Sequence, residues 1–370
     1  MHQKRLHNRL LKHIPKKRLM IAHVAGALGV LRLLEFIITC RKPVIAVLTY
    51  HRIAVPNDPA QPYYDPVISA TPESFRTHIE LLVQRFQVLT LEELLCLQAG
   101  GQTHKSFKKP GVFITFDDGY RDNCEIALPL LQSYGVPATF FIATKFLEDP
   151  DLPWWDHVAR ILKTTNVRTL CLERFKGDKE PLHVGLGRDA STDVRKRAVR
   201  TVVDCFLDDS ITDHSWFLDQ LNAQAEVVID TRAAGCELFM GWDEVRQLLR
   251  AGMSIGSHGH SHLALAKLDE VTQRTELTTS RMLLKNGTGK EVCALAYPFG
   301  WNQTYSTCTQ KLAVEAGYRL GFSSMEGINT LASLRREPMG LRRLNVGTGD
   351  SALLLHARFL AYGTLGRSTL

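Results

Sequence analysis

The sequence predicts an α/β fold, a barrel of parallel strands with helices outside. Two short segments, Val44–Leu48 and Val112–Phe116, are continuously apolar and rich in β-branched and aromatic residues. This pattern is typical of strands that are buried on both faces of a parallel sheet. Each segment ends in polar residues, and α/β folds place their chemistry at the carboxyl ends of strands. The length of 370 residues accommodates a barrel of about 250 residues together with an insertion and terminal segments.

The N-terminal segment is strongly basic. Residues 1–42 contain ten Lys or Arg and one acid, so they have a charge of +9, and the remaining chain has −2 of the total +7. The body is nearly neutral, and we expect no nucleic-acid partner. Three interpretations of the apolar stretch Leu19–Leu31 stay open: a secretory signal, an amphipathic helix on an anionic membrane and a helix packed on the barrel. We expect residues 1–43 to form a basic segment with an amphipathic helix, and residues 1–40 to contact the membrane.

Cysteine usage bears on the compartment. The eight cysteines are scattered, without close pairs or C-x-x-C spacing, which fits free thiols in a reducing compartment better than a disulfide framework. We therefore expect a cytoplasmic protein, or a peripheral one on the inner membrane face, with secretion through an N-terminal signal as the alternative. No stretch approaches the roughly 20 uninterrupted apolar residues of a spanning helix.

Two adjacent carboxylates, Asp117 and Asp118, end the strand predicted at Val112–Phe116. Adjacent side chains at a strand end point in different directions, so the two carboxylates can have different roles. Gly119 permits a sharp turn or a close backbone approach. Taken alone, Asp-Asp-Gly is also an ordinary turn sequence, so the pair needs support from elsewhere in the chain.

That support comes from a His-x-x-x-His pair, His258 and His262, about 140 residues later. Histidines four apart face the same side if the residues between them form a helical turn. One carboxylate and two imidazoles make a three-ligand divalent metal site with an open position for water. The second carboxylate can then act as a general base on that water. The combination predicts metal-assisted hydrolysis of an amide or ester.

Three segments in this order resemble the motifs of the polysaccharide deacetylases, the NodB-homology or carbohydrate esterase family 4 enzymes: Thr115–Gly119, Gly256–His262 and Ala296–Gly300. The resemblance covers roughly residues 44–345. It implies a distorted (β/α) barrel of the NodB-homology type with a helical insertion at about 151–239, and a C-terminal helical tail at 346–370 follows. We expect the insertion to form a lid or wall over the site, with a peripheral helical decoration as the alternative.

The resemblance implies a role for each matching residue. One divalent ion would be bound by Asp118, His258 and His262, with zinc as the first candidate and cobalt, nickel or manganese as alternatives. Asp117 would take a proton from the attacking water. Substrate and oxyanion contacts would come from the third motif, with the N–H of Phe299 as the oxyanion donor. The residues of that motif that we expect at the site are Tyr297, Pro298 and Phe299.

The general acid departs from the usual family pattern, in which it is a histidine of a C-terminal Leu-x-His motif. Leu354-Leu355-His356 has that spacing, but this segment is predicted to be a helix beyond the catalytic domain. We prefer His51, which ends the first predicted strand. Its position resembles a branch of exopolysaccharide deacetylases with the catalytic histidine on the N-terminal side. A structural histidine that caps the strand is the alternative.

A second departure is Ala296, where many members of the family have an arginine that orients the catalytic aspartate. A buried carboxylate without a partner has its pKa raised and is protonated too readily. We therefore expect another cation beside Asp117. Arg343, on a late apolar strand, is our candidate, and Arg121, just after the first motif, is its competitor.

These expectations together predict a metal-dependent hydrolase that removes N-acetyl groups from amino sugars of a polysaccharide or exopolysaccharide precursor. Its partner would be an N-acetylated glycan. One alternative is a deacetylase of a lipid-linked sugar or a small-molecule amide. The other is a catalytically silent glycan-binding relative, which would lack a ligand or the base. The expected base, Asp117, and the expected ligands, Asp118, His258 and His262, are all present, which favours the enzyme.

Overall fold

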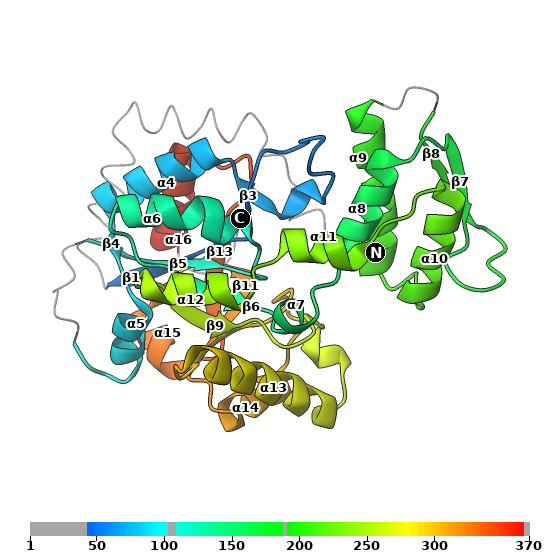
Figure 1. The fold of residues 1–370 in the computed structure, drawn as a ribbon. Coiled ribbons are helices and arrows are strands. Elements are labelled where there is room, and N and C mark those ends of the chain that lie inside the picture. The colour runs from blue at the N-terminus through cyan, green and yellow to red at the C-terminus, as the bar shows by residue number, and fades with distance from the viewer. Residues whose placement is uncertain (1–42, 103–108, 188–190, 366–370) are drawn as a thin grey trace. The chain divides into compact units, whose positions relative to one another are not determined.

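A computed structural model of the chain describes residues 43–102, 109–187 and 191–365 (Figure 1). These residues form two compact units. The larger unit contains, in its described part, residues 43–54, 69–102, 109–149 and 239–365, and the smaller contains residues 55–68, 150–187 and 191–238. The expected basic segment and its amphipathic helix fall on residues 1–42, outside the described residues. Among the helices that are described, none has the length and hydrophobicity needed to span a bilayer.

Seven parallel strands form a closed barrel in the larger unit, as the sequence predicted. In order around the barrel they are β1 (Val44–Tyr50), β5 (Gly111–Phe116), β6 (Thr139–Ile142), β9 (Ser254–Ser257), β10 (Ala294–Ala296), β11 (Leu320–Glu326) and β13 (Leu341–Asn345). The pairing of β13 with β1 closes the ring. Short strands flank it: β4 (Gln87–Val88) beside β5, β12 (Asn329–Thr330) antiparallel to β1, and the pair β2 (Arg52–Ile53) and β3 (Ile68–Ala70).

Helices of the larger unit surround the barrel (Figure 1). The first of them begins at residues suited to that position: Thr71 accepts a hydrogen bond from the N–H of Ser74, and the helix starts at Pro72. The helices are α4 (Pro72–Arg85), α5 (Leu91–Gln98), α6 (Leu128–Ser133), α7 (Lys145–Glu148), α12 (Trp242–Arg250), α13 (Glu270–Thr288), α14 (Thr307–Glu315), α15 (Leu331–Arg336) and α16 (Ala352–Leu365).

Side chains of the barrel strands alternate between two buried environments. Ile45 and Val47 of β1 belong to the apolar cluster inside the barrel, together with Phe113 of β5. Ala46 and Leu48, between them in sequence, belong to the cluster that the surrounding helices complete. Because both faces are buried, β1 and β5 have no polar alternation, which is the pattern from which these two strands were predicted.

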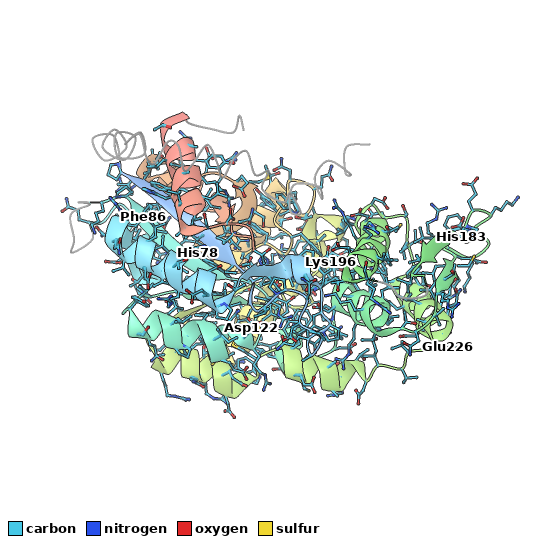
Figure 2. The ribbon with its side chains drawn as sticks, turned by 90° about the horizontal axis from the view of Figure 1, so that it is seen from above. His78, Phe86, Asp122, His183, Lys196 and Glu226 are labelled. Atoms are coloured by element: carbon cyan, nitrogen blue, oxygen red, sulfur yellow. The ribbon has the colours of Figure 1, made fainter. Side chains whose placement is uncertain are left out.

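The C-terminal helix α16 is an integral part of the barrel structure. Leu355, Phe359 and Leu360 are buried in the main core. The ring of Phe359 meets that of Phe86 edge-on, with 4.7 Å between centroids; Phe86, just after α4, is labelled in Figure 2. The segment expected as a helical tail therefore closes the helical layer beside α4.

The smaller unit has an apolar core of its own, to which Trp155 and Tyr64 belong. It was expected as an insertion at about 151–239, but it also includes residues 55–68, which the sequence analysis assigned to the barrel domain. The Tyr64 N–H donates to Asp156 Oδ1 (2.7 Å) and joins the two segments. The role of the smaller unit as a lid or wall over the site stays a prediction. The unit contains α8 (Trp154–Thr164), β7 (Thr169–Leu172), β8 (Leu182–Gly185), α9 (Thr192–Leu207), α10 (His214–Ala225) and α11 (Thr231–Leu238).

Candidate active site

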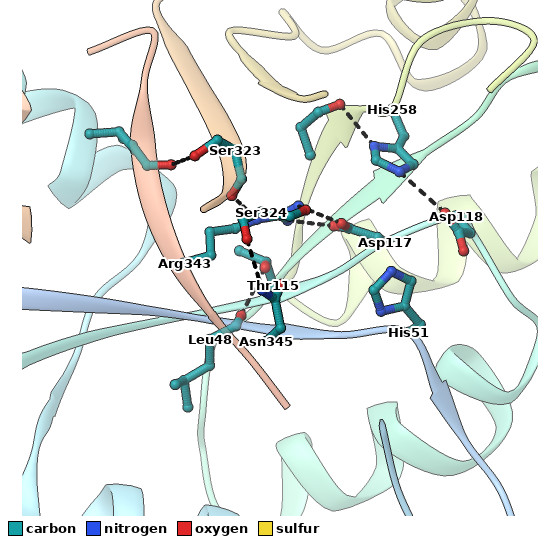
Figure 3. A network of polar contacts seen from close by, with 12 residues as sticks. Leu48, His51, Thr115, Asp117, Asp118, His258, Ser323, Ser324, Arg343 and Asn345 are labelled. Atoms are coloured by element: carbon teal, nitrogen blue, oxygen red, sulfur yellow. Dashed lines mark hydrogen bonds and ion pairs between the residues drawn. The ribbon is translucent and has the colours of Figure 1, made fainter. Parts of the chain in front are cut away.

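His51 and Asp117 lie side by side because of the strand register. β1 and β5 are parallel with Thr49 opposite Thr115, and side chains two residues apart along a strand share a face. The Asp117 N–H donates to the carbonyl of Tyr50 (2.9 Å), which continues the pairing beyond the strands. The inner faces of both strands thus lead to His51 and Asp117 at the carboxyl end of the barrel, and Figure 3 shows the His51 ring turned toward the two aspartates.

Arg343 is the ion-pair partner of Asp117. Its Nη1 donates to Asp117 Oδ1 (2.9 Å) and its Nη2 lies 2.8 Å from Oδ2, with both side chains about 1% exposed. The Arg343 Nε donates to the carbonyl of Ser323 (2.8 Å), which fixes the guanidinium plane. Burial raises the pKa of Asp117, but Arg343, His258 and His51 outweigh burial and leave this pKa below its usual value. Asp117 is therefore held as a carboxylate.

The competing candidate, Arg121, is directed elsewhere. Its Nη2 donates to the carbonyl of Phe239 (3.1 Å) and its Nη1 lies 3.4 Å from Glu244 Oε1. Arg121 thus connects the turn after β5 to the start of α12. Of the two arginines considered from the sequence, the structure brings Arg343 to Asp117.

Asp118, His258 and His262 converge as metal ligands would. The Nε2 atoms of both histidines lie 3.2 Å from Asp118 Oδ1, and one ligand atom from each residue lies within 4.8 Å of the others. Ligands about 2.0–2.2 Å from a tetrahedral zinc ion are separated by about 3.3 Å. Within the described residues, Asp118 Oδ1 is buried and accepts no well-aligned hydrogen bond, which a nearby cation would satisfy. The three side chains therefore fit a divalent ion.

The orientation of His258 suits this role. Its Nδ1 lies 2.8 Å from the carbonyl oxygen of Ala296. A carbonyl can only accept, so Nδ1 has the hydrogen, and in the neutral imidazole Nε2 would be free to bind a cation beside Asp118, as in metal-binding imidazoles. Burial lowers the pKa of His258, but Asp117 and Asp118 outweigh it and leave this pKa raised. Burial also raises the pKa of Asp118, whereas contacts with His258 and His262 hold it well below its usual value.

Backbone strain is concentrated at these motifs. Asp118 (φ 75°), His262 (φ 53°) and Phe299 (φ 61°) all have left-handed conformations without being glycine. Such conformations cost free energy and persist where the surroundings enforce them, often at functional sites. Each of the three sequence motifs contributes one such residue, so each loop is held in a shape that its own sequence does not favour.

Tyr297 lies in the core, and its burial argues against the substrate contact that was expected for this residue. Its side chain is completely buried in the main core, stacked on Tyr305 with 4.5 Å between ring centroids. The Tyr297 hydroxyl donates to the carbonyl of Met339 (2.9 Å). Pro298 is buried as well and packs beside the loop of the two histidines, because a Cβ on Gly259 would lie 3.3 Å from Pro298 Cγ. Tyr297 and Pro298 are thus packing residues next to the site.

Phe299 is the member of the third motif that faces the candidate metal ligands. It is partly exposed, and its ring meets that of His262 edge-on with 4.9 Å between centroids. In the described part of the chain its N–H donates to no backbone or side-chain acceptor. The next residue must be glycine: Gly300 has φ 69°, and a Cβ there would lie 2.5 Å from the Ser324 nitrogen. The turn thus leaves the Phe299 N–H available to an oxyanion.

Glu276 is a site residue that sequence reasoning missed. It lies on α13, is 7% exposed, and its Oε2 accepts from the N–H groups of His260 (3.1 Å) and Ser261 (2.8 Å). One carboxylate oxygen thus holds the loop between His258 and His262, the two candidate histidine ligands. Its partners are backbone groups 15 and 16 residues away, and a glutamate on a helix gives no signal of such contacts. His260 itself lies 2.8 Å from Thr144 Oγ1 through Nδ1.

His356, the alternative acid, lies in the helical layer. Its ring on α16 meets that of Phe86, with 6.1 Å between centroids, and it borders a small cavity with Ala46 and Leu48. Those two residues face outward from β1, so the barrel wall separates His356 from Asp117. The structure thus brings His51 to the site and leaves His356 outside the barrel.

The sequence of the chain matches a known family. The family described as "Polysaccharide deacetylase" matches residues 104–167 and 189–321, more than half of the chain. The Bacillus subtilis (strain 168) protein named "Putative polysaccharide deacetylase YxkH" is 23% identical over 308 residues, 83% of this chain and 73% of YxkH.

Two solved structures are similar in fold. The Streptococcus pyogenes deacetylase PplD, in complex with acetate, has a TM-score of 0.56 at 18% identity and covers 86% of this chain and 99% of its own. IcaB from Ammonifex degensii has a TM-score of 0.51 at 16% identity and covers 86% and 97%.

Proposed function

The chain belongs to the polysaccharide deacetylase family, and from this membership we propose that it removes N-acetyl groups from amino sugars of a polysaccharide or exopolysaccharide precursor, using one divalent metal ion. As a member of this family it is a hydrolase of carbon–nitrogen bonds other than peptide bonds. The observation that best supports the finer proposal is the convergence of Asp118, His258 and His262 next to the Asp117–Arg343 pair.

Asp118, His258 and His262 would hold the ion. One carboxylate and two imidazoles suit zinc first, with cobalt, nickel or manganese as alternatives. When bound, the ion supplies a Lewis acid that polarises the acetyl carbonyl and acidifies water. Three ligands from the protein leave room for substrate and water, as in catalytic rather than structural zinc sites.

Asp117 takes a proton from the water that attacks the carbonyl carbon. Arg343 engages both carboxylate oxygens, at 2.9 and 2.8 Å, and so keeps Asp117 ionised and fixed in direction. Each carboxylate oxygen has more than one lone pair, so the ion pair leaves acceptor capacity for the water. The Phe299 N–H donates to the oxyanion as it forms, an interaction commonly worth about 3–4 kcal/mol of barrier.

His51 gives a proton to the nitrogen as the C–N bond breaks, because an amide nitrogen does not leave as an anion. Its side chain is only partly buried, unlike Asp117, so a bound substrate can reach it. Burial lowers the pKa of His51, although Asp118 and Asp117 act in the opposite direction. When His51 has its proton, a lowered pKa makes the imidazolium a stronger acid toward the leaving amine.

Metal content and acetate release from oligomers of N-acetylglucosamine test the proposal together. The wild type should hold about one ion and release acetate. Asp117→Asn should keep the ion and lose at least about 10²-fold in kcat, whereas His258→Ala should lose the ion. His260→Ala removes a neighbouring histidine that is not a ligand and should keep the ion. A wild type that holds no ion after divalent metals are added back would refute the proposal.

A further inference from the structure

We propose that Asn123 is a positioning residue for His51: its side chain holds the backbone at the break between β1 and β2 and so sets where the imidazole meets the leaving nitrogen. The inference rests on the proposed role of His51 as the general acid. It concerns a residue of the turn after the first motif for which the sequence analysis gave no function.

His51 lies between two strands, and side chains hold its backbone. β1 ends at Tyr50 and β2 begins at Arg52. The His51 N–H donates to Ser69 Oγ (2.9 Å), and its carbonyl accepts from Asn123 Nδ2 (2.7 Å). Both polar groups of the His51 peptide backbone are thus bound by side chains where sheet pairing is interrupted. The position of the imidazole therefore depends on these two side chains.

Asn123 acts together with the residue before it. Asp122 Oδ2 accepts from Arg52 Nε (2.8 Å), and Oδ1 accepts from the Ile53 N–H (3.0 Å) and from Asn123 Nδ2 (2.9 Å). Arg52 is 4% exposed and Asn123 is completely buried; Asp122 is labelled in Figure 2. The Asp122–Asn123 pair thus binds three consecutive residues, 51 to 53. Residues in so many simultaneous contacts have little freedom to move separately.

The segment that follows β5 contains the proposed base and also a side chain that locates the proposed acid. Asn123 begins the π-helical turn η2 (Asn123–Ala127), which continues into α6, and single π-helical turns are frequent at functional sites. Asp117 and Asp118 precede this turn by a few residues. A side chain from it therefore ties the His51 segment to the segment that bears the base, and the spacing between acid and base becomes a property of one short stretch of chain.

The reaction itself provides a specific test of acid placement. Water adds to the carbonyl carbon, the C–N bond breaks with its electrons going to nitrogen, and the His51 proton goes to that nitrogen, giving acetate and an amine. 4-Nitrophenyl acetate needs no such proton, because 4-nitrophenolate leaves as an anion. A displaced His51 should slow amide hydrolysis and spare hydrolysis of this ester, whereas general damage to the fold or metal site should slow both.

The experiment compares kcat/KM for an N-acetylglucosamine oligomer with kcat/KM for 4-nitrophenyl acetate, at equal metal content. His51→Ala should lower the amide-to-ester ratio by about 10² or more, and Asn123→Ala by about 10-fold through misplacement. Asn123→Asp, which keeps the size, removes the donor and adds a charge beside Asp122, should lower the ratio as well. Cys124→Ala changes a buried core neighbour and should leave the ratio unchanged.

Each outcome distinguishes the inference from the function on which it rests. An unchanged ratio in Asn123→Ala, with His51→Ala lowering it, would overturn the role of Asn123 alone. An unchanged ratio in His51→Ala would overturn the acid assignment itself. If Asn123→Ala does not fold, Asn123→Asp decides the question. A selective loss of amide hydrolysis in the Asn123 variants, with metal content and ester hydrolysis kept, supports the inference.

Discussion

The Asp117–Arg343 ion pair shows that the position of a charge in space matters more than its place in sequence. The third motif has Ala296 where many relatives have an arginine, and Ala296 is buried in the cluster inside the barrel. The guanidinium comes instead from β13, where Arg343 is completely buried. A buried carboxylate requires a cation. Position 296 on β10 and position 343 on β13 can both supply it, because both side chains face the barrel interior.

Two replacements of Arg343 should distinguish the effect of its positive charge from the effect of its two-point contact with Asp117. Arg343→Lys keeps a cation but cannot engage both oxygens of Asp117, since an ammonium is a point charge without the planar fork of arginine. We expect kcat to fall by about 10- to 100-fold with bound metal unchanged. Arg343→Ala leaves a buried charge without its partner and should cost about 3–5 kcal/mol of unfolding free energy.

Kinetics, metal analysis and denaturant unfolding of the two Arg343 variants measure these effects. Loss of the metal ion from a folded Arg343→Lys variant would mean that Arg343 supports the ligands and not the base, which would refute the assignment.

The loop that contains His258 and His262 depends on a neighbouring helix for its shape. His262 and Gly259 both have positive φ, and α13 holds the loop between them through Glu276. Charge-assisted hydrogen bonds from backbone N–H groups to a buried carboxylate are stronger than neutral ones. We therefore expect the helix to contribute to metal binding, although it contains none of the candidate ligands.

Glu276→Ala should weaken metal binding by about 10- to 100-fold, the range for residues that orient metal ligands. Glu276→Gln is the matched control, since its amide oxygen can still accept from the N–H groups of His260 and Ser261, and it should lose less affinity. Titration of the apoprotein with zinc against a competing chelator measures both dissociation constants. Equal affinity for wild type and Glu276→Ala would show that the loop keeps its shape without α13.

The strands and motifs could be predicted from the sequence because their signals are local. Continuous apolar runs revealed β1 and β5, and a charge within an apolar strand made Arg343 a candidate. The contacts of Glu276 and Asn123 could not be predicted in this way. Both side chains bind backbone groups of distant segments, and such contacts need no particular sequence at the partner. The burial of Tyr297 could not be predicted either, because an aromatic residue in a motif has the same local pattern whether it packs in the core or lines the site.

The division of the molecule into two units was only partly visible in the sequence. The long segment Pro150–Leu238 is recognisable as an insertion from its length. The shorter segment Val55–Ile68 has the length of an ordinary loop and gives no such signal. Tyr64 of the shorter segment is nevertheless buried in the core of the smaller unit. A core assembled from two separated segments requires long-range packing, which single-sequence patterns do not encode.

Because the two units have separate apolar cores, we expect them to unfold in separate transitions. Phe217 is completely buried in the smaller unit and meets Phe206 edge-on with 5.3 Å between ring centroids. Phe322 is completely buried inside the barrel. Either Phe→Ala change should cost about 3–5 kcal/mol in its own core. The candidate metal ligands all belong to the larger unit. Phe322→Ala should therefore release metal at a lower temperature, whereas Phe217→Ala should unfold its unit early and leave metal release near the wild-type temperature.

Calorimetry combined with a zinc-sensitive dye during heating distinguishes the two variants. In Phe217→Ala we expect an early unfolding transition without dye signal, and in Phe322→Ala the dye signal should accompany the shifted transition. A single transition that moves equally in both variants, with metal release following it each time, would show that the two units unfold as one cooperative structure. The smaller unit would then contribute to the stability of the metal site, and a change in its core would destabilise the barrel as well.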